Sequence, residues 1–206
     1  MEKTILFLTA SPLGKDSVSV RMAEACENAV SQVYPGARVI RRDLSAINFP
    51  SIDRETVNYF NGEKTALPAE TTAFLDDLCQ EFMAADVYVF ALPHWNLSVP
   101  PLVFSYSLCT MRAGKAFRYT EAGPVGMLEH KQTLLLLASG GDCDTENPIM
   151  RCYGVDWLKG ILGLCGVSDV DVIYAQGMEG RPDAAGVIVE SALEATVAFV
   201  KSDPWR

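Results

Sequence analysis

Three short, almost uninterrupted apolar runs constrain the fold of this chain more than any other feature. They cover residues 4–9, 86–92 and 133–138, and the last contains four consecutive leucines. A strand that is apolar along its length is buried on both faces, which is typical of the central strands of a parallel sheet. These runs therefore predict a sheet that is covered by helices on both sides.

Two further strands are expected, a charged edge strand at 38–41 and a fifth strand at 169–174. Apolar residues at helical spacing, or segments bounded by helix start and stop signals, predict helices near residues 23–33, 70–84, 102–111, 149–165 and 181–201. Residues 44–68 are expected to be irregular, and 114–126 to form a small hairpin. Strands that alternate with helices in this way predict an α/β protein, with residues 1–206 as a single domain.

Composition excludes several classes of function. The net charge of −9 argues against a nucleic-acid surface, and no apolar run approaches the length of a membrane span. The start of the chain leads directly into a strand and does not resemble a signal peptide, so we expect a cytoplasmic protein. Its six cysteines form no CxxC motif and are expected to be reduced thiols. The two histidines are far apart in the sequence without cysteines at ligand spacing, so no metal site is expected.

The loop after the first strand is rich in small hydroxyl residues. Ser17 and Ser19 stand where the next helix is expected to begin, and Ser11 precedes them. The free N–H groups of a helix start and its dipole favour an anion, and serine hydroxyls add donors. The alternative is that Ser17 is an ordinary N-cap without a ligand. The loop matches neither the Walker nor the GxGxxG pattern.

The loop after the third strand is stiff. Pro93 ends the apolar run, and the prolines at 100–101 preset the start of the next helix. Trp95 and Asn96 are held between them at the carboxyl end of a strand, where ligands bind in open α/β sheets. An aromatic ring and an amide at this place can cover and hydrogen-bond a flat heterocycle. The alternative is that Trp95 packs into the core.

The loop after the fourth strand of the sheet begins with Ser139, Gly140 and Gly141. Paired glycines allow a ligand to approach the backbone closely, or they simply permit a tight turn. The carboxyl ends of parallel strands lie on one edge of a sheet, so we expect all three loops to meet there. Together they offer an anion site, an aromatic and amide wall and backbone donors, which are the requirements of flavin mononucleotide (FMN).

These residues resemble those of the FMN-dependent NADH azoreductases, a family within the flavodoxin-like quinone reductases. Four segments carry the resemblance: Ser11 with Ser17-Val18-Ser19, Pro93-His94-Trp95-Asn96 with Pro100, Phe117-Arg118-Tyr119-Thr120-Glu121 with Gly123-Pro124 and Gly126, and Ser139-Gly140-Gly141. Their order and spacing agree with the family over nearly the whole chain.

The resemblance implies a flavodoxin-like three-layer sandwich with strand order 2-1-3-4-5. It implies bound FMN, NADH or NADPH as electron donor, and two-electron reduction of quinones and azo compounds in a ping-pong cycle. No catalytic side chain is expected, because the flavin carries the chemistry. The FMN-binding residues that it implies are Ser11, Ser17, Val18, Ser19, Pro93, His94, Trp95, Asn96, Leu97, Ser139, Gly140 and Gly141. It also implies a homodimer with flavin sites at the interface, where Phe117 and Tyr119 would reach the substrate.

Three departures from the family pattern stand close to the expected site. His94 replaces an aliphatic residue or Met, and it either stacks beside the ring or tunes the flavin potential. The arginine that many relatives carry before the glycines is missing, and the acidic run 142–146 would repel an anionic dye. Cys143 is either a redox thiol or a bystander, and its acidic neighbours disfavour the thiolate.

A flavodoxin-type electron carrier without an organic substrate of its own is the alternative function. The segment 114–126 favours the enzyme, because a carrier does not need an aromatic arm over its flavin. A phosphoacceptor domain would need acidic residues at the ends of the first and third strands, and the sequence has none there.

Overall fold

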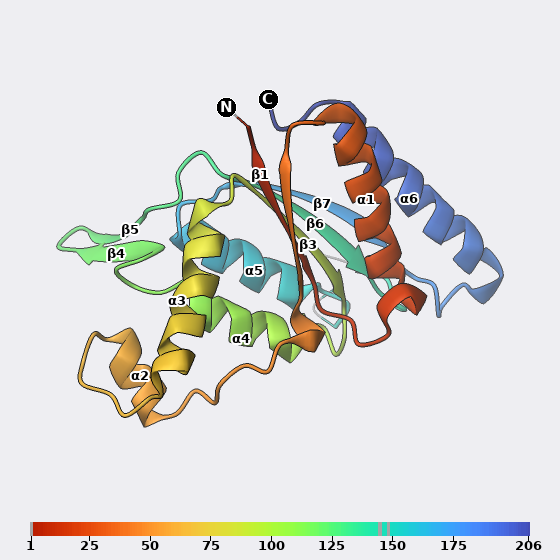
Figure 1. Cartoon of the computed structure of the whole chain (residues 1–206). Helices are drawn as coiled ribbons and strands as arrows, with labels where there is room; N and C mark the ends of the chain where they lie inside the picture. The colour runs from red at the N-terminus through yellow and green to blue at the C-terminus, as the bar shows by residue number, and fades with distance from the viewer. Residues whose placement is uncertain (1, 144–145, 148) are drawn as a thin grey trace.

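The three apolar runs form the centre of a five-stranded parallel sheet, as expected (Figure 1). The computed structural model describes residues 2–143, 146–147 and 149–206. The sheet has the order β2-β1-β3-β6-β7, which is 2-1-3-4-5 when only its own strands are counted. Its members are β1 (Thr4–Thr9), β2 (Arg38–Asp43), β3 (Val87–Pro93), β6 (Gln132–Ala138) and β7 (Asp169–Ala175).

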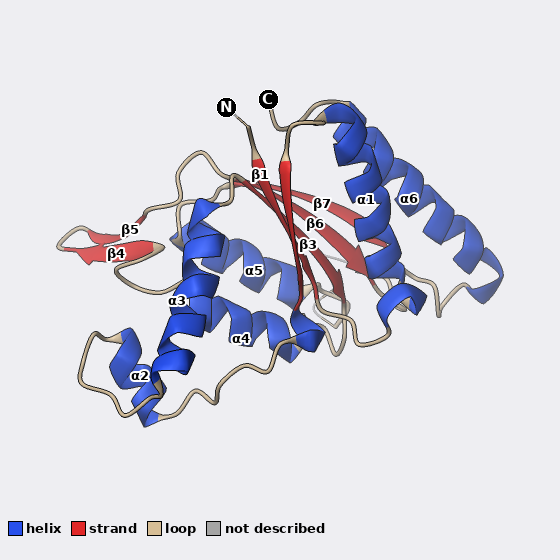
Figure 2. Cartoon of the chain, in the orientation of Figure 1, coloured by secondary structure: helices blue, strands red, loops and turns tan. Residues whose placement is uncertain are grey.

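Helices cover both faces of the sheet and complete the predicted sandwich (Figure 2). On one face lie α1 (Val18–Val33) and α6 (Ala185–Lys201). On the other lie α3 (Ala69–Ala84), α4 (Pro101–Thr110) and α5 (Tyr153–Leu164).

Alternate residues of each central strand point to opposite faces and form two apolar cores. On β1, Ile5 and Phe7 pack toward α1 and α6, whereas Leu6 and Leu8 pack toward the helices of the other face. All seven residues of β3 are buried. The strands are apolar throughout because both of their faces lie inside the protein.

The prediction that residues 44–68 are irregular is wrong in part. Arg54–Phe60 form a short helix, α2, and the Asp53 side chain caps it by accepting a hydrogen bond from the N–H of Thr56 at 3.0 Å. Asp is a favoured N-cap residue because its carboxylate satisfies a free N–H of the first turn. The N-cap signal was therefore present in the sequence, but the helix is only two turns long.

The predicted hairpin is confirmed. Strands β4 (Phe117–Thr120) and β5 (Gly123–Gly126) pair antiparallel and extend away from the main sheet (Figure 1). The hairpin is anchored where a Cβ on Gly126 would lie 2.2 Å from the backbone nitrogen of Gly166, so glycine is required at this contact. Among the described residues, no helix combines the length and the apolar character that crossing a bilayer requires.

Candidate flavin site

The loop after β1 ends in an unusual helix start. Ser17 is the N-cap residue of α1, but within the described chain its side chain makes no capping hydrogen bond. Its hydroxyl instead lies 3.0 Å from the hydroxyl of Ser19. The alternative that Ser17 is an ordinary N-cap is therefore wrong. The first N–H groups of α1 remain available to an anion.

Ser11 adds a second unusual group to this loop. It is buried, and its hydroxyl has no hydrogen-bond partner among the described residues. A buried polar atom without a partner is costly and indicates a ligand or ordered water that the atom is placed to bind.

The loop after β3 forms a tight turn. Backbone hydrogen bonds join Trp95 and Ser98 in both directions, at 3.0 and 2.9 Å. Asn96 and Leu97, the two central residues, have φ angles of 48° and 62°. Two positive φ angles define a type I′ turn, in which asparagine is favoured because it tolerates the left-handed region. The turn presents Trp95 outward with 43% of its surface exposed, so the alternative that Trp95 packs into the core is wrong.

The loop after β6 is fixed by its neighbours. The Ser139 hydroxyl donates to the Gly141 carbonyl oxygen at 2.6 Å. The N–H groups of Gly177 and Glu179 donate to the carbonyl oxygens of Gly141 and Gly140, at 3.1 and 2.9 Å. The segment that follows β7 therefore holds this glycine loop in place.

The three loops meet around one cavity of about 640 Å³ at the carboxyl edge of the sheet. Ten of the twelve predicted cofactor residues line it: Ser11, Ser17, Val18, Pro93, His94, Trp95, Asn96, Ser139, Gly140 and Gly141. Ser19 is buried beneath Ser17, and Leu97 points outward from the turn with 39% of its surface exposed. The expected convergence of three loops is thus confirmed.

Five lining residues were not predicted: Leu13, Asp16, Ala138, Met178 and Glu179. Leu13, Asp16 and Ala138 are neighbours of predicted residues and follow from them. Met178 and Glu179 come from the loop after the edge strand β7, which was not predicted to contribute although Gln176, Gly177 and Gly180 offered an amide and glycines there.

A second cavity, of about 740 Å³, shares Trp95 and Asn96 with the first. It is mainly apolar, and Phe104 on α4 and Trp157 on α5 line its wall with ring centroids 5.5 Å apart. The Trp95 side chain therefore separates a polar cavity from an apolar one.

The two predicted substrate residues lie on the hairpin. Phe117 is packed in the apolar core, whereas Tyr119 has 73% of its surface exposed, and their rings meet edge to face. Neither is among the described residues that line the two cavities. Within one chain the hairpin therefore does not reach the site.

The prediction that all cysteines are reduced is wrong for one pair. Cys143 and Cys152 form a disulfide with Cα atoms 5.4 Å apart, and the other four cysteines are free and buried. Cys143 lies in the loop after β6 and Cys152 directly before α5, and the fold brings the two together although they are nine positions apart in the sequence. Chain size and the absence of a CxxC motif, on which the prediction rested, do not report on such a contact. Cys143 is consequently not an isolated bystander.

The disulfide lies beside His94, so this histidine has two cysteine neighbours that sequence spacing did not reveal. Burial lowers the pKa of His94, and a hydrogen bond to the backbone of Leu97 partly offsets this. The imidazole therefore favours its neutral form.

Part of the acidic run is neutralised. Asp142 forms an ion pair with Arg181, which follows β7. The expectation that residues 142–146 repel anions rests in part on Asp144, which lies outside the described residues.

Comparison with known proteins places this geometry in a family. Residues 3–199 match the family model described as "Flavodoxin-like fold". FMN-dependent NADH:quinone oxidoreductase 2 of Bacillus cereus is 35% identical over 198 residues, which cover 92% of this chain and 94% of that protein. FMN-dependent NADH:quinone oxidoreductase 1 of Bacillus subtilis is 33% identical, with 93% and 95% covered. The chain belongs to the FMN-dependent NADH:quinone oxidoreductase family.

Solved structures agree with this assignment. The azoreductase AzrA superposes with a TM-score of 0.84 at 29% identity and covers 95% of this chain and 98% of its own. An FMN-dependent NADH-azoreductase from Bacillus anthracis, solved in complex with FMN, has the same fold with a TM-score of 0.82 at 23% identity, covering 96% of this chain and 99% of its own. The resemblance inferred from four short segments is thus confirmed over the whole sheet.

Proposed function

We propose that this protein is an FMN-dependent NADH:quinone oxidoreductase that also reduces azo compounds. The observation that carries the proposal is the cavity at the carboxyl edge of the sheet, in a chain that is 35% identical to FMN-dependent NADH:quinone oxidoreductase 2 over 92% of its length. The cavity joins an anion-binding helix start to an aromatic and amide wall.

We propose that the start of α1 holds the FMN phosphate. The Ser11 and Ser17 hydroxyls would donate to phosphate oxygens, together with the backbone N–H groups of Val18 and Ser19. The buried Ser11 hydroxyl without a partner supports this assignment, because a phosphate oxygen would satisfy it. The Ser19 hydroxyl, which lies 3.0 Å from the Ser17 hydroxyl, would fix the orientation of the Ser17 side chain.

The ring of the flavin would lie between the two remaining loops. Trp95 and the residues of its turn would cover one side, and the Ser139–Gly141 loop would present backbone groups to the ring edge. Asn96 would donate its amide to a ring atom. In α/β sheets of this kind, ligands bind outside the carboxyl ends of the strands, where these loops are found.

FMN held by these residues would supply two-electron transfer from NADH or NADPH to a quinone or azo acceptor. The chain's own residues would then bind and orient the reactants, and backbone N–H groups would stabilise negative charge at the ring edge. No side chain needs to act as a nucleophile. The apolar cavity beside Trp95 would receive an aromatic acceptor, because Phe104 and Trp157 offer flat apolar contacts.

We also propose that residues 1–206 form one FMN-binding domain and that two chains form a homodimer. Exposed aromatic residues around the apolar cavity support the dimer: Trp95 and Phe104 are 43% and 50% exposed in the single chain. The exposed Tyr119 would then reach the partner's site. Sedimentation analysis of the native protein and of Phe104→Glu tests this; a native protein that sediments as a monomer would contradict it.

A cytoplasmic location is part of the proposal, because the enzyme requires a supply of NADH. In that reducing compartment the Cys143–Cys152 pair would be open to reduction. Cell fractionation tests the location, and recovery outside the cytoplasm would contradict it.

The decisive experiment combines a spectrum with an assay. Purified protein should show the absorption bands of oxidised flavin after incubation with FMN, and NADH consumption should accelerate strongly when menadione is added. A protein that takes up FMN but does not consume NADH with menadione would instead be the flavodoxin-type electron carrier. A protein that takes up no FMN would contradict both functions.

A further inference from the structure

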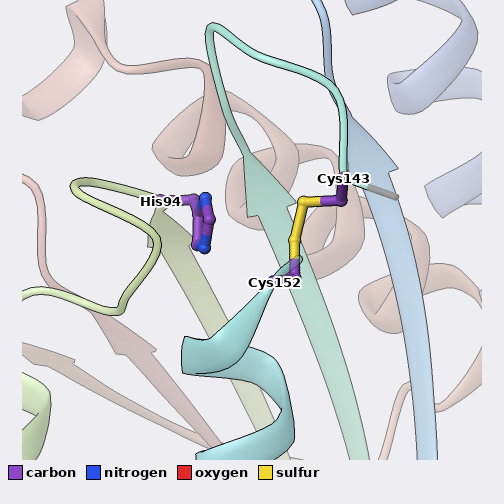
Figure 3. A group of neighbouring side chains, drawn as sticks. All are labelled: His94, Cys143 and Cys152. Carbon is purple, nitrogen blue, oxygen red and sulfur yellow. A yellow bond between two sulfur atoms is a disulfide. The ribbon is translucent and has the colours of Figure 1, made fainter. Parts of the chain in front are cut away.

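A cluster of three metal-ligating side chains lies beside the cavity. A ring nitrogen of His94 and the sulfur atoms of Cys143 and Cys152 all lie within 4.8 Å of one another. Figure 3 shows the imidazole, from the loop after β3, facing the disulfide that joins the loop after β6 to the residue before α5. Among the residues that the structure describes, this is the one group of three or more such ligands.

We propose that, when the Cys143–Cys152 disulfide is reduced, the two thiolates and the His94 imidazole bind one Zn²⁺ ion. Thiolate sulfur and imidazole nitrogen are the ligands that Zn²⁺ prefers in proteins. Three protein ligands leave the fourth tetrahedral position to a water molecule. The site shares His94 with the lining of the proposed flavin cavity, but binding of the ion requires no step of the proposed oxidoreductase function.

The histidine is arranged as a metal ligand. Its Nε2 atom is buried and has no hydrogen-bond partner among the described residues. No described residue therefore uses the lone pair of this nitrogen. In metal-binding histidines one ring nitrogen offers such a lone pair to the metal, and a neighbouring backbone or carboxylate group usually orients the ring through the other.

The sulfur atoms can reach the required positions with little movement. Zn–S bonds of about 2.3 Å and Zn–N bonds of about 2.0 Å place tetrahedral ligand atoms roughly 3.5–4 Å apart. The Cα atoms of the two cysteines are 5.4 Å apart, and Cys143 is only half-buried in its loop. Breaking the S–S bond therefore allows the sulfurs to separate around an ion without movement of β3 or α5.

Reduction of the disulfide needs no electrons from the flavin. A phosphine and one water molecule reduce the disulfide to two thiols and a phosphine oxide; in a cell, a dithiol that becomes a disulfide supplies the same two electrons and two protons. Zn²⁺ then displaces the two thiol protons and binds the thiolates. The oxidised protein has no thiolate to offer, so zinc binding reports the redox state of the pair.

The other cysteines are poor competitors for zinc. Cys26 and Cys165 are fully buried, and burial raises the pKa of each thiol to about 12. Cys26 lies in the core between α1 and the sheet and is a matched control.

The test uses the FMN-loaded protein under anaerobic conditions. One sample is reduced with a phosphine, which is then removed, and a second sample is left oxidised. Each is titrated with Co²⁺, whose tetrahedral thiolate complexes absorb in the red, beyond the bands of oxidised flavin, and then with Zn²⁺ by calorimetry. We expect one ion per chain in the reduced sample and none in the oxidised sample.

Variants locate the site. Cys143→Ser should weaken binding in the reduced protein by more than the roughly 10- to 100-fold that loss of an outer ligand partner costs. Cys26→Ala should bind as the unaltered protein does. The proposal is overturned if the oxidised protein binds equally well, if Cys143→Ser binds with unchanged affinity, or if the reduced protein binds no ion. The comparison of reduced and oxidised samples decides the question even if a variant does not fold.

Discussion

The backbone N–H of Gly154 donates a hydrogen bond to the carbonyl oxygen of Leu97 across 3.1 Å. Gly154 belongs to the first turn of α5, and Leu97 to the turn that presents Trp95 to both cavities. A Cβ on Gly154 would lie 2.5 Å from the backbone nitrogen of Val99. The site loop therefore rests directly on the helix, and the contact requires a residue without a side chain.

Gly154→Ala should displace this turn and weaken FMN binding. The methyl group would meet backbone atoms, which cannot move aside as the end of a flexible side chain can. We expect a loss of about 1–3 kcal/mol in the free energy of unfolding, as for other overpacked sites. Urea unfolding and titration of FMN by its fluorescence measure both effects.

Gly160→Ala is the matched control in the same helix. A Cβ at Gly160 would meet no described atom within 4 Å apart from its chain neighbours and the backbone of its own helix. Replacing an interior helical glycine by alanine should stabilise the protein by up to about 1 kcal/mol and leave FMN affinity unchanged. If the two variants had the same free energy of unfolding and the same FMN affinity, the close contact at Gly154 would have no role in either.

The central sheet could be predicted because its strands are buried on both faces. Such strands are apolar along their whole length, and this pattern predicted both bounds of β1 to the residue. The loops of the site were predictable for a related reason: Pro93 fixes the backbone at the end of one strand, and the glycine pair permits a tight turn or a close ligand approach at the end of the next. Trp95 shows the limit, since an aromatic residue suits a core and a ligand wall equally well.

Other features depend on contacts between distant residues and could not be predicted in this way. The pairing of Cys143 with Cys152 requires the path of the loop between β6 and α5. Its approach to His94 depends in addition on β3 and β6 being neighbours in the sheet. Glu179 joins the cavity because its N–H binds the carbonyl oxygen of Gly140, a contact that leaves no trace in the spacing of either residue.

Reduction of the disulfide should destabilise the protein measurably. The bond joins residues nine positions apart, and closing a loop of this length removes conformational entropy from the unfolded chain. The loss on reduction should be about 2–3 kcal/mol in the free energy of unfolding. Urea unfolding with and without a phosphine, in metal-free buffer, measures it.

Cys143→Ser supplies the control for that measurement, since it has no disulfide to lose. Its stability should not respond to the reductant. An equal response of both proteins would mean that the reductant acts elsewhere.

Stability at acid pH should depend on Asp203. The hydrogen bond from the Tyr34 hydroxyl and the ion pair with Arg206 lower the pKa of this carboxyl. A carboxyl with a lowered pKa stabilises the fold above its unfolded pKa of 3.8, and this contribution is lost as pH falls through the folded pKa. Asp203→Asn removes the titration but suits the positive φ of 58° at this position. The difference in stability between the two proteins should shrink from pH 6 to pH 3; a difference that does not change with pH would rule out this role.

Ser11→Ala should separate recognition of the phosphate from recognition of the flavin ring. The Ser11 hydroxyl has no partner in the described chain, so its removal should leave the stability of the FMN-free protein unchanged. A hydrogen bond to a charged phosphate contributes about 1.5–3 kcal/mol, so FMN affinity should fall roughly 10- to 150-fold. Riboflavin lacks the phosphate, and its affinity should be the same for both proteins. Ser31→Ala removes an exposed hydroxyl of α1 that bonds to the carbonyl oxygen of Asn28, and it should change neither affinity. If Ser11→Ala weakened riboflavin and FMN equally, Ser11 would act on the ring or on the fold of the loop, and the phosphate would have to bind elsewhere.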